Sequence, residues 1–103
     1  MSIVAILTTI DDRDVASSIA HTLVERRLAA CVQISEIRSV YRWGGAVQEE
    51  REFRLLIKTT RDRYADVESH LKALHTYDLP AIFALDVSDA SADYADWVES
   101  NCT

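Results

Sequence analysis

Hydrophobic and polar positions follow two kinds of pattern along the chain, one typical of strands and one typical of helices. Apolar runs rich in β-branched residues at 3–9 and 81–87 predict two strands. Two other stretches repeat apolar residues at helical spacing, and each begins near residues suited to capping a helix. The expected caps and stripes are Asp11 or Asp12 before Val15, Ile19, Leu23 and Leu28, and Thr60 or Asp62 before Tyr64, Val67, Leu71 and Leu74.

The longest strand-like stretch folds back at the chain's only two glycines, Gly44 and Gly45. Nothing interrupts a strand over 29–43 or over 46–60, and an arm of that length reaches on the order of 45 Å. A globule of this chain length has a radius of gyration of ~13 Å, which corresponds to roughly 33 Å across. We therefore expect the hairpin to overhang its own domain. Its exposed aromatic residues then need a partner, which favours an oligomer.

The predicted elements follow the order strand, helix, strand, strand, helix, strand, and a last short helix with Ser91 as its cap. Two strand–helix units with a hairpin between them match the ferredoxin-like split βαβ arrangement. We expect an α+β sandwich in which both long helices cover one face of an antiparallel sheet. The other face would be bare in a monomer. In the first hairpin arm the apolar alternation shifts after Ile34, which predicts a bulge near Ser35 and Glu36.

Composition narrows the class of protein without identifying a function. The 103 residues suit one domain over 1–103, and a 49% hydrophobic content excludes disorder. No apolar run approaches the ~20 residues of a membrane span. The net charge of −6 disfavours nucleic acid as a partner. Because no basic leader precedes the first strand, we expect a cytoplasmic protein. We expect Cys31 to be buried and Cys102 to lie exposed at a frayed end.

The sequence contains no catalytic signature. A phosphate-binding glycine loop and the G-x-S-x-G, C-x-x-C and H-E-x-x-H motifs are all absent, so an enzyme is the least favoured class. Of the three histidines, His21 and His70 fit exposed helix positions. His75 ends the second predicted helix, where the helix dipole favours a cation, and a metal-ligand role stays open.

A candidate binding site involves the second hairpin arm. Glu52 and Lys58 share one face of that arm by parity, and they could hold an anionic or metal-linked ligand against His75 or Tyr77. The alternative is that these charges pair across strands with Arg42 or with a neighbouring subunit. The acidic residues Asp86, Asp89, Asp93 and Asp96 are typical of a solvated face.

Four segments of the chain carry a family resemblance. In order they are LVERRLAACV, SVYRWGGAVQEEREFRLLIKTT, HTYDLPAI and YADWV. Together they resemble the CutA family, the divalent-cation-tolerance proteins, over nearly the whole chain. The resemblance implies a ferredoxin-like trimer in which long hairpins reach neighbouring subunits. It also implies a role in tolerance or binding of metal ions such as copper. The architecture is similar to that of the trimeric PII signalling proteins, whose ligands bind in clefts between subunits.

The resemblance assigns expected roles to particular residues. Tyr41, Trp43 and Phe53 become trimer-interface residues rather than members of one chain's own core. A pocket between subunits is expected to be lined by Glu52, Lys58, His75 and Tyr77, with His75 as the candidate ligand of copper or zinc. Some relatives carry a cysteine at the position of Thr8 and a second histidine at the position of Leu74, so this chain retains only part of that copper site. A PII-like protein that binds a small ligand is the alternative function, and a scaffold for another protein is a third.

Overall fold

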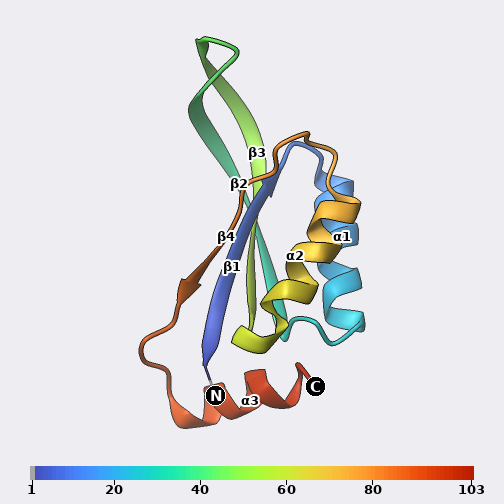
Figure 1. Ribbon diagram of the computed structural model, residues 1–103, viewed down its shortest axis with the longest axis vertical. Helices are drawn as coiled ribbons and strands as arrows, with labels where there is room; N and C mark the ends of the chain where they lie inside the picture. The colour runs from blue at the N-terminus through green and yellow to red at the C-terminus, as the bar shows by residue number, and fades with distance from the viewer. Residues whose placement is uncertain (1) are drawn as a thin grey trace.

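Strands and helices follow one another in the predicted order within the computed structural model, which describes residues 2–103 (Figure 1). The elements are β1 (Ile3–Ile10), α1 (Arg13–Glu25), β2 (Cys31–Trp43), β3 (Ala46–Thr60), the 3₁₀ turn η1 (Arg61–Arg63), α2 (Tyr64–Leu74), β4 (Ile82–Asp86) and α3 (Ala92–Ser100). The strands form one sheet in the order β2-β3-β1-β4, and every neighbouring pair is antiparallel. This arrangement confirms the predicted ferredoxin-like α+β fold. None of the described helices is both long enough and apolar enough to cross a membrane.

One face of the sheet carries the hydrophobic core. Both α1 and α2 lie on that face, and α3 lies across the end of the sheet near the N-terminus (Figure 1). Alternate residues of β1 and β3 point toward the two long helices and are fully buried, because the strand period places every second side chain on the same face. The largest fully buried apolar side chains of this core are Val4, Ile6, Ile10, Leu55, Ile57, Ile19, Leu23, Val67 and Leu71.

Two of the predicted helix caps are present, and the third differs. The side chain of Asp12 accepts a hydrogen bond from the N–H of Val15 at 3.0 Å, and Ser91 caps α3 in the same way. No side chain caps α2, which begins after Arg63 and follows the short turn η1. The hydroxyl of Thr60 instead donates to the carboxylate of Asp62 at 2.5 Å. Because a 3₁₀ turn precedes α2, the two candidate caps lie one turn too early to bond its first N–H groups.

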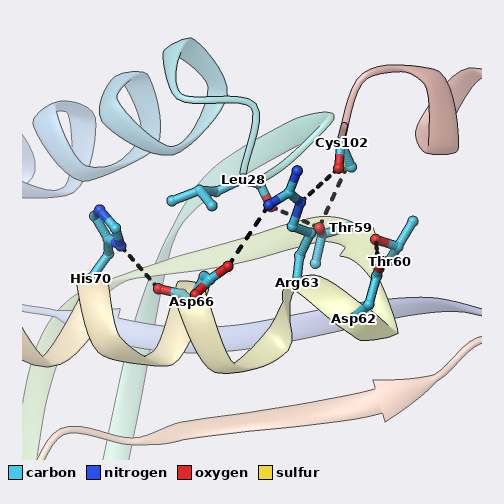
Figure 2. Close-up of polar contacts among 8 residues, drawn as sticks. All are labelled: Leu28, Thr59, Thr60, Asp62, Arg63, Asp66, His70 and Cys102. Carbon is cyan, nitrogen blue, oxygen red and sulfur yellow. Dashed lines mark hydrogen bonds and ion pairs between the residues drawn. The ribbon is translucent and has the colours of Figure 1, made fainter.

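The C-terminal end is held in place, which corrects the prediction that Cys102 is exposed and frayed. The Cys102 side chain is only 2% exposed and packs against Ile3, Ala30 and Val98. The Nε of Arg63, at the start of α2, donates to the carbonyl of Cys102 at 2.6 Å (Figure 2). Contacts between residues far apart in sequence therefore order this end. Cys31 on the edge strand β2 is half-buried rather than fully buried, and both thiols are free.

The hairpin is a regular ladder from its base to its tip. Pairing between β2 and β3 runs without interruption from Cys31–Lys58 to Trp43–Ala46. The predicted bulge near Ser35 and Glu36 is therefore wrong. Since β2 is an edge strand with mostly exposed side chains, no buried face requires its alternation to be restored. At the tip, Gly44 and Gly45 have φ values of 62° and 78°, the positive pair that a two-residue hairpin turn requires.

The hairpin extends beyond the rest of the sheet. Only Phe53–Thr60 of β3 pairs with β1, so the residues of β3 from 46 to 52 have β2 as their single strand partner among the described residues. We call this part of the hairpin, residues 37–52, the overhang. The molecule measures 45 × 25 × 21 Å, and its radius of gyration is 14.2 Å. The overhang visible at the top of Figure 1 accounts for the long axis, as the strand lengths predict.

The structure separates Phe53 from the other two predicted interface residues. Phe53 pairs with Ile10 at the last position of the β1–β3 ladder and faces the helices, where it joins the chain's own core. The guanidinium of Arg13 lies 5.3 Å from the centre of its ring. The prediction that Phe53 lies outside one chain's core is therefore wrong, because the helical layer extends just far enough to cover it. Tyr41 and Trp43 lie on the overhang, and Trp43 is 54% exposed.

Two buried threonines on the helix-covered face of the sheet allow a matched test of the core. Thr59 Oγ1 donates to the carbonyl of Leu28 at 2.7 Å, whereas Thr8 Oγ1 has no hydrogen-bond partner within residues 2–103. A buried hydroxyl without a partner costs free energy, so we expect Thr8→Val to raise the free energy of unfolding by ~1 kcal/mol. Thr59→Val should lower it by ~1–2 kcal/mol because it leaves the Leu28 carbonyl without its donor. Urea unfolding at one fixed protein concentration measures both. Equal destabilisation by the two substitutions would contradict this account.

Candidate functional site

A cavity of about 660 Å³ lies between the overhang and the connection from α2 to β4. Its walls come from the two arms of the hairpin, from the end of β1 and from the α2–β4 connection. We call it the hairpin cavity. The residues that line it are Thr9, Ser39, Tyr41, Trp43, Glu50, Glu52, Thr76, Tyr77, Asp78, Leu79 and Ala81.

The register of the hairpin explains which side chains reach this cavity. Ser39 pairs with Glu50 across the ladder, and partners in an antiparallel pair point to the same face. Odd-numbered residues of β2 and even-numbered residues of β3 therefore share the cavity side. The opposite wall is the irregular α2–β4 connection. The chain leaves α2 in extended conformation at His75, and Pro80 disfavours helical geometry at Leu79.

Glu52 is the most buried charged residue of the cavity. The residue is only 7% exposed, and its Oε2 accepts a hydrogen bond of 2.8 Å from the hydroxyl of Tyr77. Within residues 2–103 no lysine, arginine or histidine forms an ion pair with it. Burial of a carboxylate is costly unless its charge is paired. Within the described part of the chain, the buried Glu52 carboxyl therefore has the Tyr77 hydroxyl as its hydrogen-bond partner and no cationic partner.

The two tyrosines report the electrostatics of the cavity. Burial, the hydrogen bond to Glu52 and the charges of Glu52 and Asp11 raise the pKa of Tyr77 far above its usual value. Partial burial and the carboxylate of Glu50 raise the pKa of Tyr41. Both phenols therefore stay protonated, and the cavity carries a negative potential.

Both ring nitrogens of His75 are engaged. The backbone N–H of Tyr77 donates to Nδ1 at 3.1 Å, so that nitrogen is unprotonated and the proton lies on Nε2. The Nε2–H then donates to the carbonyl of Thr9 at 2.7 Å. The ring also lies 4.7 Å from the ring of Tyr77. In this geometry a second proton on Nδ1 would face the N–H of Tyr77.

The described residues contain no ready metal site. No group of three or more histidine, cysteine, aspartate or glutamate side chains within residues 2–103 could hold a metal ion. A metal at His75 Nδ1 would have to displace the Tyr77 N–H and take its other ligands from elsewhere. Thr8 offers none, because its side chain is buried in the core, whereas Thr9 lines the cavity.

Lys58 lies apart from the other three residues of the predicted pocket. It pairs with Ala5 and Cys31 near the base of the sheet, and its Nζ lies 5.5 Å from the centre of the Tyr94 ring. Lys58 lies on the same face of β3 as Glu52, but their spacing along the strand places the two residues ~20 Å apart. Within one chain, the structure brings Glu52, Tyr77 and His75 together and leaves Lys58 outside.

Sequence reasoning missed several residues of the cavity. Glu50 and Asp78 add two exposed carboxylates, and Tyr41 and Trp43 form its aromatic wall, although they were expected only as interface residues. The parity of the hairpin arms could have indicated Glu50, Tyr41 and Trp43. No local signal indicated Asp78, because the course of the α2–β4 connection depends on contacts with β1.

Comparison with known proteins agrees with the fold and the motifs. The family model of the CutA1 divalent ion tolerance protein matches residues 4–101. The divalent-cation tolerance protein CutA of Thermus thermophilus is 43% identical over 97 residues, which cover 93% of this chain and 94% of the relative. That of Pyrococcus horikoshii is 36% identical over 95 residues, which cover 92% and 93%. The solved structure of Cut A1 from Thermus thermophilus superposes with a TM-score of 0.93 at 41% identity and covers 98% of this chain and 99% of that one. The chain therefore belongs to the CutA1 divalent ion tolerance protein family.

Proposed function

We propose that this protein contributes to tolerance of divalent cations as a cytoplasmic homotrimer. The family supplies the role, since its relatives are named for it. The observation that carries the assembly is the apolar surface that one chain leaves uncovered. Two free cysteines and no disulfide fit a reducing compartment such as the cytoplasm.

The uncovered surface has two parts. The first is the face of the sheet opposite α1 and α2, where Phe83 and Leu85 of β4 are 49% and 55% exposed. The second is the overhang, which exposes Val40, Trp43 and Val47. An exposed apolar patch combined with unpaired strand edges favours association through the sheet. A closed ring lets each overhang meet the sheet of the next copy, and the family resemblance favours three copies.

A role without catalysis is supported by the chemistry of the hairpin cavity. Its lining offers carboxylates, phenols and hydroxyls, but no cysteine or histidine side chain. The raised pKa values of Tyr41 and Tyr77 keep both phenols protonated, so neither is present as a phenolate base. Pairs of cysteine or serine with histidine, which activate a nucleophile in many enzymes, are therefore absent from these lining residues.

His75 is the candidate ligand for copper or zinc. Its ring contacts Tyr77, whose hydroxyl binds the Glu52 carboxylate. Its Nδ1 becomes free to bind a metal once the hydrogen bond from the Tyr77 N–H is broken. The remaining ligands would come from a neighbouring subunit. A PII-like role with an anionic ligand is the weaker candidate, because Glu50, Glu52 and Asp78 would repel an anion and Lys58 lies far from them in the single chain.

We expect Trp43→Ala to weaken the trimer before it unfolds the subunit. The indole lies on the overhang and is not part of the chain's own core, so its removal should take away contact area between copies and leave the core packing intact. Light scattering after size exclusion at low micromolar concentration should report a smaller mass for Trp43→Ala. Val24→Ala, which changes an exposed residue on α1, should leave the mass unchanged. An intact trimer with unchanged melting in Trp43→Ala would refute the role of the overhang.

We expect calorimetric titration of the metal-free protein with copper and with zinc to detect binding that depends on His75. The affinity should be weak, because the metal has to displace the Tyr77 N–H from Nδ1 and finds no ready group of further ligands within residues 2–103. His75→Ala should abolish it. The control His70→Ala should retain it, because the His70 ring lies on α2 and contacts Arg26 and the Asp66 carbonyl. Equal binding by His75→Ala and the wild type would exclude His75 as the ligand.

A further inference from the structure

The last residues of the chain cross the end of the sheet that lies opposite the tip of the hairpin (Figure 1). Residues 88–91 leave β4 without regular secondary structure and are exposed, and α3 follows them. We call residues 88–103 the strap. Its buried side chains Val98 and Cys102 pack with Ile3 and Ala30 in a cluster of their own. The apolar attachment of the strap to the sheet is therefore small.

Two arginines from the helical side of the sheet hold the backbone of the strap. The Nε of Arg27, just after α1, donates to the backbone oxygen of Thr103 at 2.6 Å, and the same guanidinium also donates to the carbonyl of Ser100. The Nε of Arg63 in the turn η1 donates to the carbonyl of Cys102 at 2.6 Å (Figure 2). Because hydrogen bonds from a charged donor are stronger than neutral ones, these two side chains form a polar latch on the strap.

Arg27 occupies a backbone position that favours glycine. Its φ is 58°, and its N–H donates to the carbonyl of Val24 at 3.0 Å. The N–H of Leu28 donates to the carbonyl of Leu23 at 2.9 Å, which completes the bond pattern that ends a helix with a left-handed residue. A side chain costs free energy in this conformation. Glycine would suit the backbone better but could not reach the strap, so the contacts of the guanidinium offset a local cost.

The main core does not depend on the strap. Within residues 2–103, every buried member of the main hydrophobic cluster comes from β1, α1, β3, α2 or the segment between α1 and β2. Parts of a fold with few buried apolar contacts open at a lower free energy than the whole domain. The strap also lies at the opposite end of the molecule from the overhang (Figure 1). Its opening therefore requires no change in the hairpin.

We propose that the strap opens as one unit while the rest of the fold stays closed, and that Arg27 and Arg63 set how often it opens. The exposed residues 88–91 are the hinge. Opening uncovers the base of the sheet and brings the Cys102 thiol into solvent. The molecule thus has a second state at this end, separate from the proposed contacts between copies and from metal binding at His75.

The test labels thiols in the native assembled protein with DTNB, and peptide mass spectrometry separates the two cysteines. Cys102 is 2% exposed and reacts only when the strap opens, whereas Cys31 lies on β2, outside the strap. Local opening exposes little surface, so the Cys102 labelling rate should stay nearly constant over low urea concentrations. Labelling through global unfolding would rise steeply with urea instead, because its dependence scales with the surface exposed.

Substitutions test the latch. Arg27→Gly removes one of its two side chains and relieves the backbone, so folding is not at risk. It should raise the Cys102 labelling rate about tenfold, because charged hydrogen bonds to the strap are lost. The control Arg26→Ala should leave the rate unchanged, because the Arg26 guanidinium contacts His70 rather than the strap. Cys31 labelling and the mass of the assembly should be the same in both variants and the wild type.

Three results would overturn the proposal. They are a Cys102 labelling rate that rises with urea as steeply as global unfolding, an equal rate in Arg27→Gly and the wild type, and an equal acceleration of Cys31 in Arg27→Gly. The second would mean that other contacts, within the chain or from a neighbouring copy, hold the strap closed. None of these results bears on the mass of the Trp43→Ala variant or on the metal titration, so failure here is distinguishable from failure of the proposed function.

Discussion

The pairing of β3 with β2 beyond the end of β1 is the constraint on which the rest of the structure depends. The register joins Ile10 of β1 to Phe53 of β3, and no residue of β1 pairs with β3 beyond that point. Up to Phe53 the sheet has helices on one face and buries an ordinary core. Beyond it, β3 continues with one strand partner and no helix against it. An isolated two-stranded ribbon is at best marginally stable in water. The length of the two arms therefore favours contacts with a second copy that stabilise the overhang.

The hairpin cavity arises at the same step in the sheet. Glu52 is the residue of β3 immediately beyond the last pair with β1, and the α2–β4 connection occupies the place that a longer β1 would have filled. Three hydrogen bonds fix this connection. The His75 Nε2–H donates to Thr9 at the end of β1, the Tyr77 N–H donates to His75, and the Tyr77 hydroxyl donates to Glu52. Glu52 therefore has β2 on one side and the α2–β4 connection, in place of β1, on the other.

The sequence predicts the parts of this molecule that depend on local signals. The Asp12 and Ser91 caps, the glycine turn and the lengths of the arms follow from a few neighbouring residues each. Other features depend on what packs against them. Phe53 and Lys58 lie on the strand faces that their positions in the sequence indicate. Alternation along a strand does not, however, show how far the helices extend over that face, which decides the burial of Phe53. It also does not bring Lys58 close to Glu52. Cys102 packs against Ile3, Ala30 and Val98, and Arg63 of the turn η1 holds its carbonyl, which no local pattern could indicate.

The central claim is that another copy of the chain completes the overhang. Amide hydrogen exchange of the native protein, resolved along the hairpin, tests it most directly. If neighbouring copies cover the overhang, amides of residues 47–52 should exchange as slowly as those of residues 53–59, which lie in the covered part of the same strand. If residues 47–52 exchange orders of magnitude faster than residues 53–59, the overhang is a free ribbon and the account is contradicted.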